Sequence, residues 1–173
     1  MAFPPPSTVF YTWDVDMVNI EKVPQTGKGV YVAMLDTGLV PNWADYFPKE
    51  RIASQLGIGF DQHVLFKVNK DGSSYEVEVG LLKKSTFIGS RGSSHGTHTT
   101  STILGYFYRS NSDAAGGYPL PPIIIRGIAP EVTIIPVKVL ADYQVPALPH
   151  ANPPTPSHND VFGTDEMIAA GIN

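Results

Sequence analysis

The sequence contains no cysteine, and this absence excludes several kinds of functional site. Disulfide bridges, thiolate zinc sites and cysteine nucleophiles all require that residue. A strong excess of either charge is also missing, because 12 Lys and Arg against 16 Asp and Glu leave a net charge of -4 at pH 7. Binding to nucleic acid or to an anionic membrane surface calls for a basic excess, so we expect neither partner.

The sequence also lacks long apolar runs. None approaches the roughly 20 residues of a membrane-spanning helix. Residues 1–7, Met-Ala-Phe-Pro-Pro-Pro-Ser, have no basic segment and no sustained apolar stretch, so they do not have the pattern of a signal peptide. What is present is an ordinary globular composition, with 42% hydrophobic and 16% charged residues over 173 positions, which indicates one domain.

Two stretches have patterns that point to chemistry. Residues 30–38, Val-Tyr-Val-Ala-Met-Leu-Asp-Thr-Gly, are an apolar run that ends in an acid, which predicts a buried strand with Asp36 at its carboxyl end. Residues 92–101 start as a turn of small residues and continue in a helical pattern, which places His95 near a helix start. A carboxylate and an imidazole in these positions are two parts of a proton-transfer device.

Four motifs follow one another in a recognisable order: Leu-Asp-Thr-Gly at 35–38, His-Gly-Thr-His at 95–98, Gly-Ile-Ala-Pro at 127–130 and the apolar run at 134–140. Together they resemble the amino-terminal part of the catalytic domain of the subtilisin-like serine proteases, the subtilases. The resemblance implies that Asp36 and His95 are the acid and the base of a Ser-His-Asp triad. It also implies a serine endopeptidase that acts on proteins or peptides and is secreted.

The nucleophile of such a triad is not evident. In the family it would resemble Gly-Thr-Ser-Met-Ala, and the nearest match, residues 163–167, has Asp165 where the serine should be. We therefore expect the serine segment to lie beyond Asn173, which would make the chain a fragment. Loss of the serine costs subtilisin a roughly millionfold factor in rate, so we expect the chain alone to be inactive.

Two other interpretations remain open. Asp36-Thr37-Gly38 is also the signature of aspartic proteases, in which two such acids share a proton, so a single copy would have to act as a homodimer. That interpretation gives no reason for the His95 motif. The third possibility is a non-catalytic remnant that serves as a binding module.

The proposed chemistry requires no cofactor, and the resemblance to subtilases suggests a structural calcium ion. Asp45 lies nine residues after Asp36 and matches an acid that many subtilases use as a calcium ligand. Residues 111–113, Asn-Ser-Asp, could add oxygen ligands, but we prefer a solvated loop with an acid that caps a helix as the explanation, because Asn and Asp are common in loops. His98 forms a His-x-x-His pair with His95, and we expect it to be a buried structural residue rather than a metal ligand.

Strands and helices alternate along the chain, which predicts an α/β fold with a mainly parallel sheet flanked by helices, as an incomplete version of the subtilisin fold. We interpret residues 1–173 as one partial catalytic domain. Its expected parts are an extended Pro-rich start at 1–12, a hairpin insertion at 62–80, a helix at 97–107, a buried strand within 123–140, a Pro-rich loop at 141–162 and a helix capped by Thr164.

Overall fold

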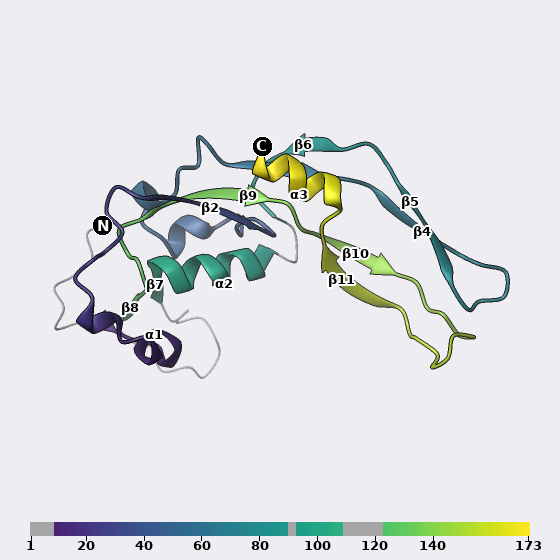
Figure 1. Ribbon diagram of the computed structural model, residues 1–173, viewed down its shortest axis with the longest axis horizontal. Helices are drawn as coiled ribbons and strands as arrows, with labels where there is room; N and C mark the ends of the chain where they lie inside the picture. The colour runs from purple at the N-terminus through teal and green to yellow at the C-terminus, as the bar shows by residue number, and fades with distance from the viewer. Residues whose placement is uncertain (1–8, 90–92, 109–122) are drawn as a thin grey trace, which may run out of the picture.

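The computed structural model describes residues 9–89, 93–108 and 123–173 (Figure 1). The helices are α1 (Trp13–Met17), α2 (Ser93–Leu104) and α3 (Asp165–Ile172), with short 3-10 turns η2 (Ile20–Lys22), η3 (Trp43–Asp45) and η4 (Lys49–Arg51). The strands are β1 (Val9–Phe10), β2 (Tyr31–Asp36), β3 (Ile58–Asp61), β4 (Val64–Val68), β5 (Tyr75–Val79), β6 (Lys83–Ser85), β7 (Gly105–Tyr108), β8 (Ile123–Arg126), β9 (Thr133–Lys138), β10 (Ala141–Val145) and β11 (His158–Phe162). No helix in these ranges is long and apolar enough to cross a membrane.

A four-stranded sheet in the order β2-β9-β3-β6 forms the centre of the molecule. Strand β2 runs parallel to β9, with Tyr31 opposite Thr133 and Asp36 opposite Lys138. Strand β3 is also parallel to β9, whereas β6 is antiparallel to β3. The mixed α/β architecture that the sequence predicts is therefore confirmed, and Asp36 lies at the edge of the sheet where the parallel strands end.

The two faces of this sheet have separate cores. On the α2 side, Leu104 of the helix packs with Ile134 of β9 and with Leu39 and Phe47 from the loop after β2. On the other face, Met167 of α3 packs with Val137 and with Phe60 of β3. Ile134 and Val137 are three positions apart in one strand, so their side chains point to opposite faces. Figure 1 shows the two helices on opposite sides of the sheet.

The apolar run at 123–140 is two strands rather than one, which corrects the sequence prediction. Strand β8 pairs with β7 and β1 in a second sheet, while β9 belongs to the central sheet. The chain turns between them at Gly127, where an added Cβ would lie 2.2 Å from the backbone nitrogen of Gly105. Gly127 and Pro130 interrupt the run in the sequence, as a turn into a strand, but the apolar pattern does not show that the two strands belong to different sheets.

The helix that carries His95 starts four residues earlier and ends three residues earlier than the predicted span of 97–107. Helix α2 ends at Leu104, and Gly105 follows with a φ of 78°, a conformation that favours glycine and commonly ends helices. The next residues form β7 instead of a further helical turn. In contrast, α3 begins as predicted, since the hydroxyl of Thr164 accepts a hydrogen bond from the backbone nitrogen of Met167 at 3.2 Å.

Two antiparallel hairpins extend from the body of the molecule. Strands β4 and β5 form the hairpin that the sequence predicts around the Asp71-Gly72 turn; that it is an insertion stays a prediction. Strands β10 and β11 form a second hairpin, so residues 141–162 are not simply the Pro-rich loop that we expected. All five prolines of this region lie between the strands, and the strands themselves are free of proline.

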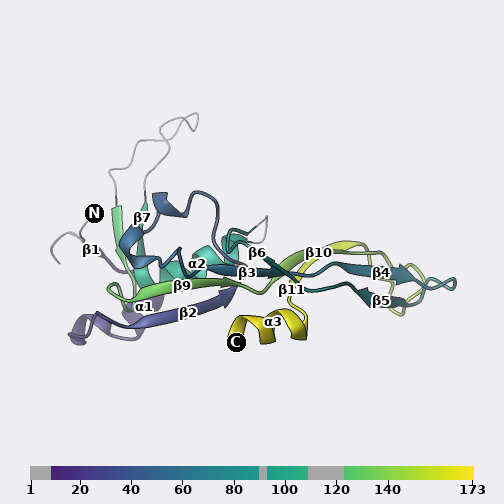
Figure 2. The ribbon, with the colours of Figure 1, turned by 90° about the horizontal axis from the view of Figure 1, so that it is seen from above.

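The two hairpins lie side by side in both views (Figures 1 and 2). Aromatic rings join them near the body: Phe162 of β11 stacks on Tyr143 of β10 at 4.3 Å between ring centroids and contacts Phe66 of β4 edge-on at 6.3 Å. At the far end, Nδ1 of His150 lies 2.6 Å from the carbonyl oxygen of Asp71. The hairpins therefore form one projecting arm.

Candidate active site

Asp36 is the last residue of β2, and its carboxylate is almost completely buried, with 9% of the side chain exposed. Oδ1 accepts a hydrogen bond from the backbone nitrogen of Thr37 at 2.6 Å and lies 2.8 Å from Nδ1 of His95. Oδ2 accepts a hydrogen bond from the hydroxyl of Thr99 at 3.1 Å. Both carboxylate oxygens therefore have partners within the chain, as a buried charge requires.

These partners set the charge of Asp36. Burial, the largest single influence, raises the pKa of its carboxyl group, but the hydrogen bonds from Thr37, His95 and Thr99 outweigh it and hold the pKa below its ordinary value. Asp36 is therefore ionised at neutral pH. Because an ionised carboxylate can only accept hydrogen bonds, Nδ1 of His95 must carry the proton that joins the two side chains. In the neutral imidazole, Nε2 then carries no proton, and its lone pair can accept one.

His95 is the third residue of α2, and 66% of its side chain is exposed. The first turn of the helix is attached to the loop after β2. The backbone nitrogen of Gly96 donates to the hydroxyl of Thr37 at 2.9 Å, and the hydroxyl of Thr97 accepts from the backbone nitrogen of Val40 at 3.0 Å. These two bonds hold the helix start against the end of the strand, which brings the imidazole to the carboxylate.

Close backbone contacts explain both glycines in the two motifs. A Cβ on Gly96 would lie 2.3 Å from the carbonyl oxygen of Gly38, which is too close for any side chain. Gly38 has a φ of 81°, and a Cβ there would lie 2.2 Å from the carbonyl oxygen of Phe87. The Asp-Thr-Gly and His-Gly-Thr-His motifs are thus the two sides of one close backbone contact.

The comparison with protein families agrees with this geometry. The model of the subtilase family matches residues 27–149, which is more than half of the chain and includes both Asp36 and His95. This chain belongs to the subtilase family. Subtilases are serine proteases, so the resemblance recognised from the sequence motifs is confirmed. No curated protein and no solved structure matches the chain significantly.

Within the described residues, no nucleophile accompanies Asp36 and His95. No serine or threonine hydroxyl in residues 9–89, 93–108 and 123–173 is hydrogen-bonded to Nε2 of His95. The segment at 163–167, the nearest match to the family's serine motif, forms the start of α3. Its Thr164 hydroxyl is hydrogen-bonded to Gln62 and caps the helix, and Asp165 is exposed.

The calcium prediction for Asp45 is not tested by the geometry. Asp45 is exposed in η3, and its Oδ2 accepts a hydrogen bond from Nδ2 of Asn42 at 3.3 Å. Within the described ranges, no group of three or more His, Asp or Glu side chains could hold a metal ion. The other suggested ligands, residues 111–113, lie outside the described residues, so a calcium site here stays a prediction.

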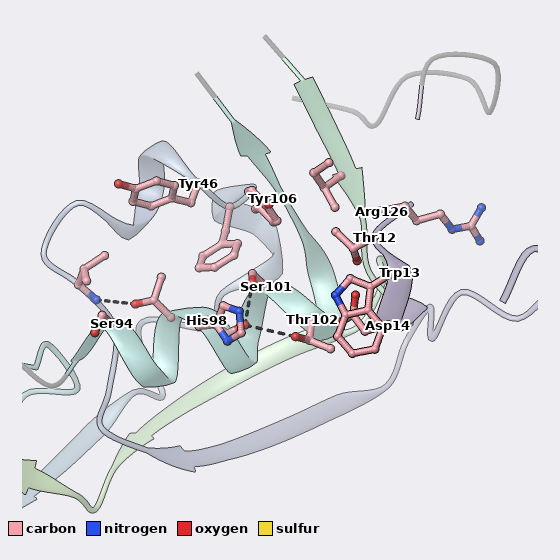
Figure 3. A pocket seen from close by; sticks show the side chains of 14 residues that line it. Thr12, Trp13, Asp14, Tyr46, Ser94, His98, Ser101, Thr102, Tyr106 and Arg126 are labelled. Carbon is pink, nitrogen blue, oxygen red and sulfur yellow. Dashed lines mark hydrogen bonds between the residues drawn. The ribbon is translucent and has the colours of Figure 1, made fainter. Parts of the chain in front are cut away.

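His98 is exposed rather than buried, which corrects the sequence prediction. The residues that α2 turns inward are Ser93, Gly96, Thr100 and Leu104, and this spacing puts His98 on the outer side of the helix. There it lines a cavity of about 670 Å³ between α1 and α2. Figure 3 shows Trp13 and Asp14 of α1 on the other side of this cavity.

Sequence reasoning also missed Thr37 and Thr99 as partners of the Asp36 and His95 pair. Thr99 is four residues after His95, so the two side chains lie on one face of the helix. That spacing is a signal that could have identified Thr99 once a helix was assumed. The role of Thr37 depends on how closely the strand and the helix approach, which no local pattern shows.

We predict that replacing Gly96 by alanine separates the helix start from the strand end. The added methyl group would overlap the carbonyl of Gly38, so the backbone must move, and we expect a loss of about 1–3 kcal/mol in the free energy of unfolding. Chemical denaturation measures this loss. Ser94→Ala, at an exposed position of the same turn, is the matched control and should stay within about 0.5 kcal/mol of the wild type. Equal stability of the two variants would contradict the close contact.

A second prediction concerns the stability of the fold at acidic pH. Because folding lowers the pKa of Asp36, its carboxylate should stabilise the fold fully above the unfolded-state pKa, about 3.9. This contribution should disappear as the pH falls further through the lowered folded-state pKa. The measurement is the unfolding free energy of the wild type minus that of Asp36→Asn from about pH 6 downward. The difference should be constant near pH 6 and shrink below about pH 4; a difference independent of pH would show that the Asp36 pKa is not lowered.

Proposed function

We propose that Asp36 and His95 are the acid and the general base of a serine endopeptidase that acts on proteins or peptides. The observation that carries this proposal is the 2.8 Å contact between Oδ1 of Asp36 and Nδ1 of His95. It joins a buried, ionised carboxylate to an imidazole that is two-thirds exposed. A general base needs this combination of fixed orientation and access to the substrate.

In the proposed reaction each residue has one role. Asp36 keeps the proton of the neutral imidazole on Nδ1 and stabilises the imidazolium that forms when His95 takes a proton. His95 removes the proton of a serine hydroxyl as that oxygen attacks the peptide carbonyl, and it then gives the proton to the leaving amine. Thr99 holds the second oxygen of Asp36, so it is a positioning residue. This chemistry needs no cofactor, and calcium bound through Asp45 would have a structural role.

We infer that the serine comes from a segment other than the described residues, so that this chain supplies the acid and base half of the site. Residues 163–167, the nearest match to the family's serine motif, form the start of α3 and have Asp165 instead of a serine, so this segment supplies no hydroxyl nucleophile. Without the nucleophile, the remaining pair lowers the barrier very little, because the members of such a triad act as a unit.

The geometry favours this proposal over an aspartic protease. In that class, two Asp carboxylates share a proton and need direct contact with each other. Here both oxygens of Asp36 are already hydrogen-bonded to groups of the same chain, and the carboxylate is buried. A second copy would have to displace His95 or Thr99 to reach it. No observation specifically favours a binding module.

We expect the Nδ1 proton of His95 to give a proton NMR signal downfield of the backbone amides, because it is held in a hydrogen bond to a charged acceptor. The signal should be absent from His95→Ala and from Asp36→Asn. Asp45→Asn, which removes an exposed carboxylate in η3, should keep it. A signal that survives in Asp36→Asn would refute the proposed pair.

The wild-type chain and His95→Ala should hydrolyse a fluorogenic peptide equally slowly, because we propose that the serine belongs to a segment other than the described residues. The measurement is the initial rate for both proteins at equal concentration. Hydrolysis by the wild type that His95→Ala loses would contradict the missing nucleophile, while it would support the role of His95.

A further inference from the structure

The strands β5 and β6 form an open edge away from the Asp36 and His95 pair. They follow one another in the chain as residues 75–85, which we call the rim strand, and Figure 1 shows them along the rim of the molecule. Within the described residues, β5 pairs with β4 and β6 pairs with β3. The other side of both strands is therefore open.

The register of the hairpin shows which backbone groups of β5 point to this open side. The backbone nitrogen of Gly80 donates to the carbonyl oxygen of His63 at 2.8 Å, and that of Asn69 donates to the carbonyl oxygen of Ser74 at 2.9 Å. Because the direction alternates along an antiparallel strand, the even-numbered residues turn their backbone groups toward β4. The odd-numbered residues of β5 turn theirs to the open side, where a further strand can pair with them.

Three apolar side chains of the rim strand are exposed as well. Val77 and Val79 are 49% and 50% exposed. Leu81 is 85% exposed, the highest value among the exposed large hydrophobic side chains of the part of the chain that the structure describes. An open strand edge with exposed apolar side chains is typical of a surface that another chain covers.

Leu81 lies at a β-bulge in the middle of the rim strand. In the two ladders, Val64 is opposite Val79 and Asp61 is opposite Lys83. Two residues lie between Asp61 and Val64, whereas three lie between Val79 and Lys83. The rim strand therefore has one extra residue at this point, and the extra residue of a bulge is left out of the ladder. The bulge places Leu81 in solvent between the two halves of the edge.

The charges of the rim strand are separated along its length. Its first half contains Glu76 and Glu78, its second half contains Lys83 and Lys84, and all four residues are exposed. Glu78 has an ion pair with Lys67 of β4. The other three have no ion pair with any described residue. One half of the edge is thus acidic and the other half is basic.

We propose that the rim strand is a dimerisation surface, on which two copies of this chain pair edge to edge. The two rim strands run antiparallel about a two-fold axis near Leu81, so β5 of one copy lies beside β6 of the other. The acidic half of each strand then faces the basic half of its partner, and the two Leu81 side chains meet at the axis. Each copy uses the same surface, as in other two-fold dimers.

The order of the charges favours this arrangement over other ways of adding a strand. Pairing β5 with β5 of a second copy would place glutamates opposite glutamates, and a parallel arrangement would align like charges; both are unfavourable. Antiparallel pairing about the middle of the rim strand makes all the facing charges opposite in sign. Because each chain has one rim strand, the assembly closes at two copies.

The first test is whether the wild-type chain associates. Sedimentation equilibrium from about 5 to 500 μM covers the range suited to a small interface. We expect a reversible equilibrium between the monomer and a species of twice its mass. A monomer over the whole range would overturn the proposal, and so would growth to larger species without a dimer.

Val77→Pro tests the backbone pairing. The lost N–H points to the open side, so the ladder with β4 keeps its hydrogen bonds. Two hydrogen bonds between the copies disappear, one from each copy, and the dissociation constant should rise about tenfold or more. Val68→Pro is the matched control, because Val68 lies opposite Tyr75 and its N–H points to the other edge of the same hairpin. An unchanged dimer in Val77→Pro, or an equal loss in Val68→Pro, would overturn the proposal.

Exchange of charges tests the orientation and keeps the proposal falsifiable if Val77→Pro does not fold. Glu76→Lys/Glu78→Lys has two basic halves, and Lys83→Glu/Lys84→Glu has two acidic halves. Each variant alone should dimerise about tenfold more weakly than the wild type, because like charges face each other. An equimolar mixture should form a heterodimer, since all the facing charges are again opposite. Wild-type dimerisation of either variant alone, or a mixture that stays monomeric, would overturn the antiparallel arrangement.

A matched control separates this effect from the change in net charge. Asp16→Lys/Glu21→Lys adds the same charge as Glu76→Lys/Glu78→Lys, at exposed positions near the start of the chain. It should dimerise like the wild type, with a dissociation constant within about twofold. An equal weakening in this control would reduce the effect to general repulsion and overturn the role of the rim strand.

Discussion

The hydrogen bond between the carboxylate of Asp36 and the imidazole of His95 is the interaction on which the rest of this site depends. It links the end of β2 to the start of α2, two elements that are 59 residues apart in sequence. The carboxylate is buried, and a buried charge without partners would destabilise the fold. The backbone nitrogen of Thr37 and the hydroxyl of Thr99 supply the remaining bonds, so the buried charge of Asp36 is compatible with folding.

The close approach of strand and helix determines which residues can occupy the motifs. Thr37 and Thr97 use their hydroxyls to connect the two elements, and neither hydroxyl contacts the imidazole. Gly96 leaves room for the helix start to meet the backbone of Gly38, and Gly38 itself, with a φ of 81°, lies against the backbone of Phe87. In this chain, conformation and packing alone account for the small residues around the acid and the base. The subtilase motifs therefore describe a structural contact as well as the proposed catalytic pair.

The Asp36 and His95 pair and the Lys138 and Asp61 ion pair share one edge of the sheet, because β2, β9 and β3 run parallel toward it. Charged side chains at that edge can remain partly solvated while the strands behind them are buried. Asp36 and Lys138 are opposite each other in neighbouring strands, yet they have different partners, His95 and Asp61. The edge thus holds the Asp36 and His95 pair and the Lys138 and Asp61 ion pair, with different exposure.

The sequence alone determined the strand that ends at Asp36, the helix start at His95, the Asp71-Gly72 hairpin, the Thr164 cap and the family, because each depends on residues close together in the chain or on motifs in a fixed order. Only the tertiary structure decided that residues 123–140 form strands in two sheets, that β10 pairs with β11 across five prolines, and that His98 faces outward. It also decided which groups surround Asp36. These features depend on pairing and burial between distant segments, and local propensity and spacing do not record such contacts.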